Sequence, residues 1–226
     1  MWNIYAKNYD SATLSFTAYK ELMQLVIENL KVTNKDSILD MGCGTGNLED
    51  ILAESDTDFS LVGLDISNEM LRVAQRKVRD DTRFNFKNFD LNMELTFESN
   101  SFNKVVMIHS LYTLNNLDSV LQNVKGVLVN GGELHIVNPL KDAQINKMVS
   151  YELKKSGVFV FIIKLLLTIP ANIINRLIAK KADANEFHFL TNEEYILLLE
   201  KNGFSVVETS LVYANQSTYI ISKITK

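Results

Sequence analysis

Residues 38–46 read ILDMGCGTG, a short apolar run that ends in Asp40 and a turn with three glycines. Apolar runs of strand length alternate with stretches of helical period on both sides of it, the pattern of a parallel sheet with helices on both faces. Ligands of such sheets bind outside the carboxyl ends of the strands. Because glycine lets the backbone approach a ligand and adopt a positive φ, we expect a ligand at Gly42, Gly44 and Gly46.

The spacing of these glycines narrows the choice of ligand. The dinucleotide fingerprint G-x-G-x-x-G has its third glycine five positions after the first. Here Asn47 takes that position and the third glycine is Gly46. The spacing argues against the usual pyrophosphate turn, but glycine spacing varies. A nicotinamide-dependent oxidoreductase therefore remains an alternative.

The pattern predicts a doubly wound α/β fold with a seven-stranded, mostly parallel, Rossmann-like sheet and a C-terminal antiparallel hairpin. Polar alternation places the third strand near an edge of the sheet. Asn130-Gly131-Gly132 is predicted to cap and end a helix, and Thr191 with Glu194 to form a capping box that opens another. The predicted helices are 13–30, 48–54, 68–78, 117–129 and one from Thr191, and the predicted strands are 37–41, 60–65, 83–88, 103–109, 133–137, 204–209 and 217–224.

Length and composition set broad limits on the class of protein. The 226 residues suit one domain with an insertion, and the net charge of −4 gives no reason to expect nucleic-acid binding. Cys43 is the single cysteine, so no intrachain disulfide and no thiolate-rich metal site can form. We find neither a secretory signal nor an apolar run long enough to span a bilayer, so a cytoplasmic location is expected. No metal is expected.

Residues 139–189 depart from the alternating plan. We treat them as a helical insertion, a lid or substrate cap, within a core of residues 1–138 and 190–226. Eight basic and two acidic residues lie between Lys141 and Lys181, and residues 158–169 read VFVFIIKLLLTI. The favoured interpretation is a lid over an acceptor pocket. The alternative is a basic amphipathic surface at residues 151–181 that contacts an anionic membrane.

Two further acids follow strands. Asp65 ends the second strand, where a carboxylate can accept hydrogen bonds from two ribose hydroxyls, although it could instead be a turn or helix-capping residue. Asp90 follows the third strand and could accept a hydrogen bond from the amino group of adenine, or be a solvated loop residue. Three acids at the ends of three successive strands indicate an adenosine cofactor.

With these motifs, residues 1–138 and 190–226 resemble the class I S-adenosylmethionine-dependent methyltransferases. The segments KNYDS (7–11), LVGLDIS (61–67), IHSLYTL (108–114) and VNGGELHI (129–136) resemble other motifs of that family. The resemblance implies S-adenosylmethionine as cofactor and S-adenosylhomocysteine as product. It assigns cofactor binding to Tyr9, Asp40, Gly42, Cys43, Gly44, Gly46, Asp65, Ile66, Met70, Phe89, Asp90, Leu91, Ile108 and His109.

The implied reaction is methyl transfer to a small molecule of lipophilic or partly apolar character. His109 and His188 are candidate bases for an acceptor that carries a proton, whereas His135, inside a strand, is expected to be structural. Tyr112 is a candidate for the acceptor pocket or for the core. The fourth strand lacks the Asn/Asp-Pro-Pro-aromatic motif of DNA amino-methyltransferases, which disfavours a nucleic-acid substrate. A cofactor-binding accessory protein without methyl transfer, or a protein that acts at a membrane surface, remains an alternative.

Overall fold

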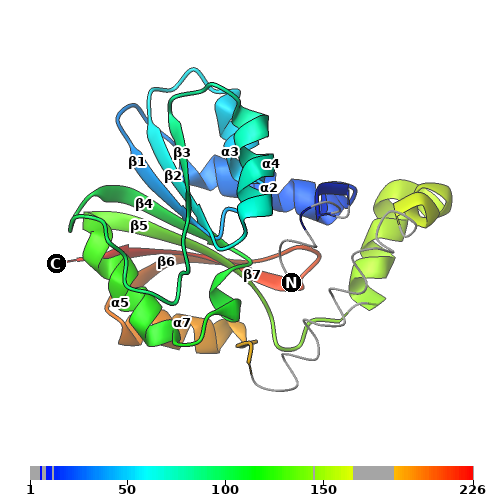
Figure 1. The fold of residues 1–226 in the computed structure, drawn as a ribbon. Helices are drawn as coiled ribbons and strands as arrows, with labels where there is room; N and C mark the ends of the chain where they lie inside the picture. Colours follow the sequence, from blue (N-terminus) through cyan, green and yellow to red (C-terminus); the bar gives the residue numbers. More distant parts are fainter. Residues whose placement is uncertain (1–5, 7–8, 12, 145, 165–185, 226) are drawn as a thin grey trace.

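The computed structural model describes residues 6, 9–11, 13–144, 146–164 and 186–225 (Figure 1). Its sheet has seven strands in the order β3-β2-β1-β4-β5-β7-β6, with β7 antiparallel to both neighbours and the other pairs parallel. The predicted fold class, the edge position of the third strand and the C-terminal hairpin are confirmed. The strands are β1 (Ser37–Met41), β2 (Ser60–Asp65), β3 (Phe84–Asn88), β4 (Phe102–Ile108), β5 (Leu128–Pro139), β6 (Phe204–Val212) and β7 (Ser217–Ile224).

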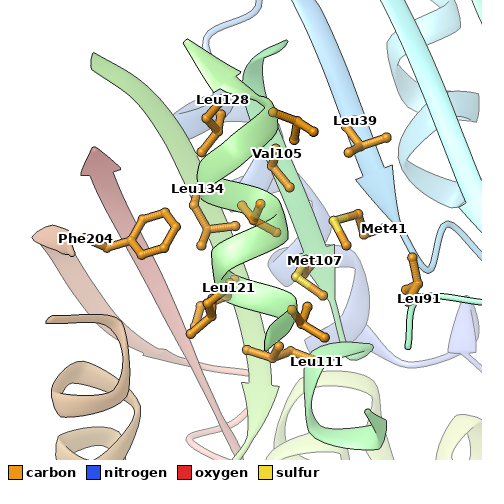
Figure 2. Packing of buried hydrophobic residues seen from close by; sticks show 14 of the residues in the cluster. Leu39, Met41, Leu91, Val105, Met107, Leu111, Leu121, Leu128, Leu134 and Phe204 are labelled. Carbon is orange, nitrogen blue, oxygen red and sulfur yellow. The ribbon is translucent and has the colours of Figure 1, made fainter. Parts of the chain in front are cut away.

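Helices cover both faces of the sheet, because its central strands are apolar on both sides. Val105 of β4 packs in one hydrophobic cluster with the helices α5 and α7, and the next residue, Val106, packs in a second cluster with α2 and α3 (Figures 1 and 2). Successive side chains of a strand point to opposite faces, so a continuous apolar run serves both clusters. The helices are α2 (Thr17–Leu30), α3 (Asn47–Ala53), α4 (Asn68–Val78), α5 (Leu117–Val127) and α7 (Asn192–Lys201), with a 3-10 turn η1 (Leu111–Thr113).

The start of α2 differs from the prediction of one helix over 13–30. The helix begins at Thr17, because Phe16 is extended, with φ −83° and ψ 132°, and its side chain caps nothing. Part of the missing cap comes from a distant segment, since the backbone N–H of Ala18 donates to Glu152 Oε1 at 2.9 Å. A cap contributed from residue 152 is invisible to local sequence patterns.

The predicted cap at Asn130-Gly131-Gly132 is wrong. Helix α5 ends at Val127, and the three residues lie inside β5. Phe102 of β4 pairs with Leu128, but Lys104 pairs with Glu133, so β5 carries extra residues at this point. Gly131 has a φ of +74° there, which is the conformation that a bulge of this kind requires of glycine.

The C-terminal elements α7 and β6 begin where the sequence predicts. Thr191 and Glu194 form the predicted capping box of α7, with both reciprocal hydrogen bonds present. Strand β6 runs to Val212, three residues beyond the predicted end at 209.

The segment between β5 and α7 leaves the sheet at its carboxyl edge. Leu140 and Leu190 form an isolated parallel bridge, so the segment departs and returns side by side. Residues 146–164 are helical, and residues 165–185 lie outside the described part of the chain. Among the described residues, no helix is both long enough and apolar enough to cross a membrane.

Candidate cofactor and acceptor site

A cavity of about 460 Å³ lies at the carboxyl ends of β1, β2, β3 and β4, where the sequence predicted a ligand. It brings together many of the predicted cofactor residues, which reach it from the ends of four strands. It also includes five residues that sequence reasoning missed. The predicted lining residues are Tyr9, Gly42, Gly44, Asp65, Ile66, Met70, Asp90, Leu91, Ile108 and His109, and the others are Asn92, Ser110, Thr113, Leu114 and Phe187.

The glycine turn after β1 is held by backbone hydrogen bonds to the end of β2. The N–H groups of Gly42 and Cys43 both donate to Leu64 O, at 2.7 and 3.0 Å. A Cβ on Gly42, whose φ is +90°, would lie 2.5 Å from Ser110 Cβ, whereas a Cβ on Gly44 would meet nothing within 4 Å. Packing therefore requires glycine at position 42, while Gly44 presents open backbone to the cavity.

Asp65 ties this turn to the end of β2. Its Oδ2 accepts a hydrogen bond from Gly44 N at 3.0 Å, and its Oδ1 accepts one from Ser67 N at 2.7 Å. Each carboxylate oxygen has a further acceptor site, so Asp65 can still bind hydroxyls in the cavity. Burial raises the pKa of Asp65, although both N–H donors lower it. Helix α4 is capped by Ser67, whose Oγ accepts from Met70 N, so the helix-capping alternative for Asp65 does not apply.

Two buried carboxyl groups lie beneath the turn. Asp40 is 3% exposed and Glu49 is fully buried. Within the described chain, Asp40 Oδ1 and both carboxyl oxygens of Glu49 have no hydrogen-bond partner. Burial and the charge of Asp65 raise the pKa of Asp40 to about 7, and burial and the charge of Asp40 raise that of Glu49. Asp40 reaches a hollow beside the cavity, and its buried carboxylate would be stabilised by a cationic ligand, which fits the positively charged methionine end of S-adenosylmethionine.

Asp40 and Cys43 reach a smaller hollow of about 30 Å³ beside the main cavity, which Tyr9 also lines. Gly46 lines neither space. It precedes α3 with a φ of +72°, and a Cβ there would lie 2.7 Å from Ala74 Cβ. Gly46 therefore allows α3 and α4 to pack closely behind the turn.

The far end of the cavity carries Asp90 and exposed apolar surface. Asp90 Oδ1 accepts from the backbone N and the side-chain Nδ2 of Asn92, at 3.0 and 2.9 Å, and Oδ2 accepts no hydrogen bond from the described residues. Ile66 is 53% exposed, as a residue that borders a flat ligand would be before binding. Phe89 lies outside the cavity and packs against the hydrophobic cluster that contains Leu91.

His109 stands at the end of β4 in a left-handed conformation, with a φ of +52°. Its Nε2 lies 3.1 Å from Ser217 Oγ, and its ring meets that of Tyr213 edge-on with a centroid distance of 5.5 Å. Burial lowers the pKa of His109 to about 4, so the imidazole is neutral near pH 7. Among the described residues no partner is found for Nδ1, which leaves this atom able to accept a proton or hydrogen bond from a ligand.

Aromatic residues form the wall of the cavity beyond His109. Phe187 lines the cavity, and Tyr112 lies behind it, with ring centroids 5.6 Å apart and planes at 85°. Tyr112 is 7% exposed and also contacts Phe189. The backbone N–H of His188 donates to Tyr112 O at 2.8 Å, which fixes the segment that carries Phe187.

The two remaining histidines do not line the cavity. The carbonyl of His188 accepts from the hydroxyl of Tyr195 at 3.2 Å, so its backbone joins the returning segment to α7. His135 is buried in β5 with Nδ1 2.8 Å from the hydroxyl of Tyr219, an arrangement that agrees with a structural role.

Comparison with known proteins identifies the domain. Residues 38–132 match the family described as "Methyltransferase domain". The chain is 29% identical over 153 residues to the demethylmenaquinone methyltransferase of Oceanobacillus iheyensis, covering 66% of this chain and 64% of that relative. It is 31% identical over 137 residues to the enzyme of the same name from Tropheryma whipplei, covering 59% and 55%. The chain thus aligns with less than two thirds of the length of these relatives.

A solved structure agrees with the fold. The S-adenosylmethionine-dependent methyltransferase from Aquifex aeolicus superposes with a TM-score of 0.66 at 17% identity, covering 96% of this chain and 98% of that one. The fold and the match to a methyltransferase domain agree with the class I S-adenosylmethionine-dependent methyltransferases, as the motifs implied. The cofactor of that class is S-adenosylmethionine, and the open glycine turn and the unpartnered Asp40 oxygen fit it. The domain match favours methyl transfer over the nicotinamide-dependent alternative.

Proposed function

We propose that this chain transfers a methyl group from S-adenosylmethionine to a small lipophilic acceptor whose aromatic ring carries hydroxyl groups, such as a reduced quinone. One observation carries the proposal: a single cavity joins a polar cofactor half to an aromatic wall at Phe187, with a neutral His109 between them. The names of the relatives, which refer to demethylmenaquinone, support a quinone ring as the acceptor.

The cofactor roles of individual residues belong to this proposal. Asp40, Gly42, Cys43, Gly44 and Gly46 hold or shape the methionine end, with Tyr9 covering it. Asp65 binds the ribose. The adenine lies among Ile66, Met70, Asp90 and Leu91, and Ile108 and His109 face the transferred methyl group. Phe89, which the motif also assigned to the adenine, packs outside the cavity against the cluster that contains Leu91. The core of residues 1–138 and 190–226 would carry these functions, with residues 139–189 as the substrate cap.

When bound, S-adenosylmethionine supplies an electrophilic methyl group and keeps the electron pair of the broken S–C bond as S-adenosylhomocysteine. The chain contributes position and exclusion of water. Phe187 holds the acceptor ring by stacking or edge contact. In the tautomer that this role requires, His109 Nε2–H donates a hydrogen bond to Ser217 Oγ and keeps its proton. Nδ1 then accepts the hydroxyl proton of the acceptor, which increases electron density on the acceptor ring as the bond to the methyl group forms. The low pKa keeps Nδ1 free of a proton at neutral pH.

Two alternatives have weaker support. His188 could act as the base only if its ring reached the cavity. His188 is not among the lining residues, whereas His109 and Phe187 are. An accessory protein that binds the cofactor without methyl transfer would not need the aromatic wall. The net charge of −4 supports the proposal that nucleic acid is not a substrate.

A transfer assay tests the proposal directly. Methyl-labelled S-adenosylmethionine would be incubated with the protein and reduced demethylmenaquinone, and label would be measured after organic extraction. We expect label with the reduced ring and little with the oxidised ring, which has no hydroxyl proton. Asp65→Ala is the control that should abolish transfer. Calorimetric binding of the cofactor without label transfer to any hydroxylated quinone would instead support the accessory role.

The proposed location is the cytoplasm, with peripheral contact to a membrane through residues 151–181. Residues 165–181 of that stretch lie outside the described part of the chain. Support for the contact comes from the described helix at residues 146–164, where apolar side chains are exposed.

A further inference from the structure

Residues 146–164 form a helical segment that projects away from the carboxyl edge of the sheet and changes direction at Gly157, whose φ is +75° (Figure 1). This turn brings Lys164 back to Glu152, and beyond Gly157 the charged and apolar residues are arranged in the reverse of the usual order. A helix on the surface of a globular protein packs its apolar face inward and points its charges to water. Here an acidic and a basic side chain point inward, and a row of large apolar side chains points outward.

The inward charges are Glu152 and Lys164. Their side chains form a buried ion pair, with Lys164 Nζ 2.6 Å from Glu152 Oε2. Glu152 Oε1 accepts from Ala18 N, and Lys164 Nζ donates to Thr17 Oγ1 at 3.1 Å. Both charges are thus used to fasten the helix to the first turn of α2.

The outward side chains lie within six residues. Phe159 is 77% exposed and Val158 is 67% exposed. By contrast, Phe161 is only 7% exposed. The outer face, which we define as Val158, Phe159, Val160, Ile162 and Ile163, therefore consists entirely of large apolar residues that each expose at least 43% of their surface.

The exposed charges within residues 146–164 are all basic. Lys147, Lys154 and Lys155 are exposed, and the single acid of this segment, Glu152, is buried. Lys155 Nζ lies 2.9 Å from the exposed Glu21 of α2, so Lys147 and Lys154 are the lysines that no ion pair of the described residues neutralises. An apolar face flanked by lysines is the pattern of a helix that lies in the interface of an anionic bilayer. A symmetric contact between two copies of this face would instead bring the lysines of both copies together.

We infer that the outer face of this helix inserts into the surface of an anionic lipid bilayer. The lysines then face the lipid headgroups, and the buried Glu152–Lys164 pair holds the apolar side chains pointing away from the protein. The helix follows the carboxyl end of β5, the same edge at which the cavity opens, and Phe187 in the cavity wall lies on the returning segment. A lipophilic acceptor could then pass from the bilayer to the cavity, a consequence that rests on the proposed function, whereas the docking itself does not.

Vesicle co-sedimentation of the full chain tests the docking without cofactor or acceptor. Vesicles of phosphatidylcholine alone would be compared with vesicles that also contain phosphatidylglycerol. We expect the wild type to bind the anionic vesicles, and Phe159→Glu to weaken the partitioning by at least about tenfold. The matched control is Leu197→Glu on α7, which places the same charge at a leucine that is 64% exposed, and which should bind as the wild type does.

Charge is tested separately. Lys154→Glu should weaken binding to the anionic vesicles and leave any binding to neutral vesicles unchanged, because the substitution leaves the outer face intact. Equal binding of wild type and Phe159→Glu, or no binding of the wild type to anionic vesicles, would overturn the inference. So would a dimer of the wild type in sedimentation velocity that Phe159→Glu dissociates, because the face would then bind a second copy.

The outcome is independent of the proposed reaction. If the wild type binds vesicles but transfers no methyl group to a hydroxylated quinone, the proposed function fails and the docking stands. If Phe159→Glu methylates a water-soluble, short-chain acceptor at the wild-type rate but loses activity toward a vesicle-bound one, both stand, and the variant is shown to be folded.

Discussion

The two halves of the cavity are built differently. Most of the cofactor half consists of three short segments that directly follow strands. Its geometry is fixed by backbone N–H groups, such as those of Gly42 and Gly44, which donate to the end of β2. The acceptor half consists of side chains from distant parts of the chain: His109 is held by Ser217, and Phe187 is held through Tyr112. Cofactor recognition is therefore local in sequence, whereas acceptor recognition depends on how the topology brings separate segments together.

The largest effect is expected for the turn itself. Gly42→Val should abolish measurable cofactor binding and lower the melting temperature, because even a Cβ would lie 2.5 Å from Ser110 Cβ. Gly44→Ala is the matched control for stability, since its Cβ meets no protein atom within 4 Å and its cost to folding is the strain of a positive φ, about 1 kcal/mol. Thermal unfolding measures both variants, and calorimetry measures cofactor binding. A Gly42→Val protein that melts as Gly44→Ala does would show that packing does not constrain the turn.

His109→Gln should lower kcat by roughly 100-fold and change the affinity for the cofactor little, because it removes a proton acceptor from the acceptor half. Since burial lowers the pKa of His109 to about 4, its neutral form persists from pH 8 down to about pH 5. The wild-type kcat should therefore fall to the level of His109→Gln only as the pH approaches 4, where His109 becomes protonated. A kcat that falls between pH 7 and pH 6 in the wild type but not in His109→Gln would contradict this low pKa.

Asp65→Ala should weaken cofactor binding at least about tenfold, or about 1.4 kcal/mol, by removing a charged hydrogen-bond acceptor. Asp65→Asn is the graded control, because it keeps one oxygen for the N–H groups of Gly44 or Ser67. The acceptor half should be unaffected in both. Unchanged calorimetric affinity of a folded Asp65→Ala protein would remove Asp65 from the cofactor site.

The smallest effect is expected at the aromatic wall. Phe187→Ala should raise the KM for the acceptor by roughly fivefold through loss of one aromatic contact, with an unchanged dissociation constant for S-adenosylmethionine. Phe187→Tyr keeps the ring and should retain most of the affinity. An equal loss of cofactor affinity in Phe187→Ala would mean that the two halves are not separable.

This difference between the halves also explains what could be predicted from the sequence. Strands β1, β2 and β7 have the predicted bounds, because each is a short apolar run between clear turns. The residues at the ends of β1 and β2 were found for the same reason. The EFHFLT segment holds two phenylalanines and could have signalled an aromatic wall, but only the three-dimensional return of the chain brings Phe187 into the cavity.

The wrong predictions share a cause. Asn130-Gly131-Gly132 has the composition of a helix cap, yet its conformation is set by pairing with β4 across a shifted register. Helix α2 begins at Thr17 because Phe16 is extended and Glu152 meets the first turn. In both cases a contact that is remote in sequence contributes. The same holds for a residue that was not predicted at all, because Ser217, which contacts His109, lies 108 positions away.

The contact between Glu152 and the start of α2 has a consequence for engineering this protein. The segment after β5 resembles a module that could be excised, but its excision would leave the amide of Ala18 and the hydroxyl of Thr17 without their partners. Loss of a helix cap costs about 1 kcal/mol. Tyr19, in the same turn, accepts a hydrogen bond from Asn47 at the start of α3, next to the cofactor turn. Loss of activity in a truncated protein could therefore come from a destabilised α2 as well as from the missing substrate cap. Single substitutions on the outer face keep the contacts of Glu152 and Lys164 with α2.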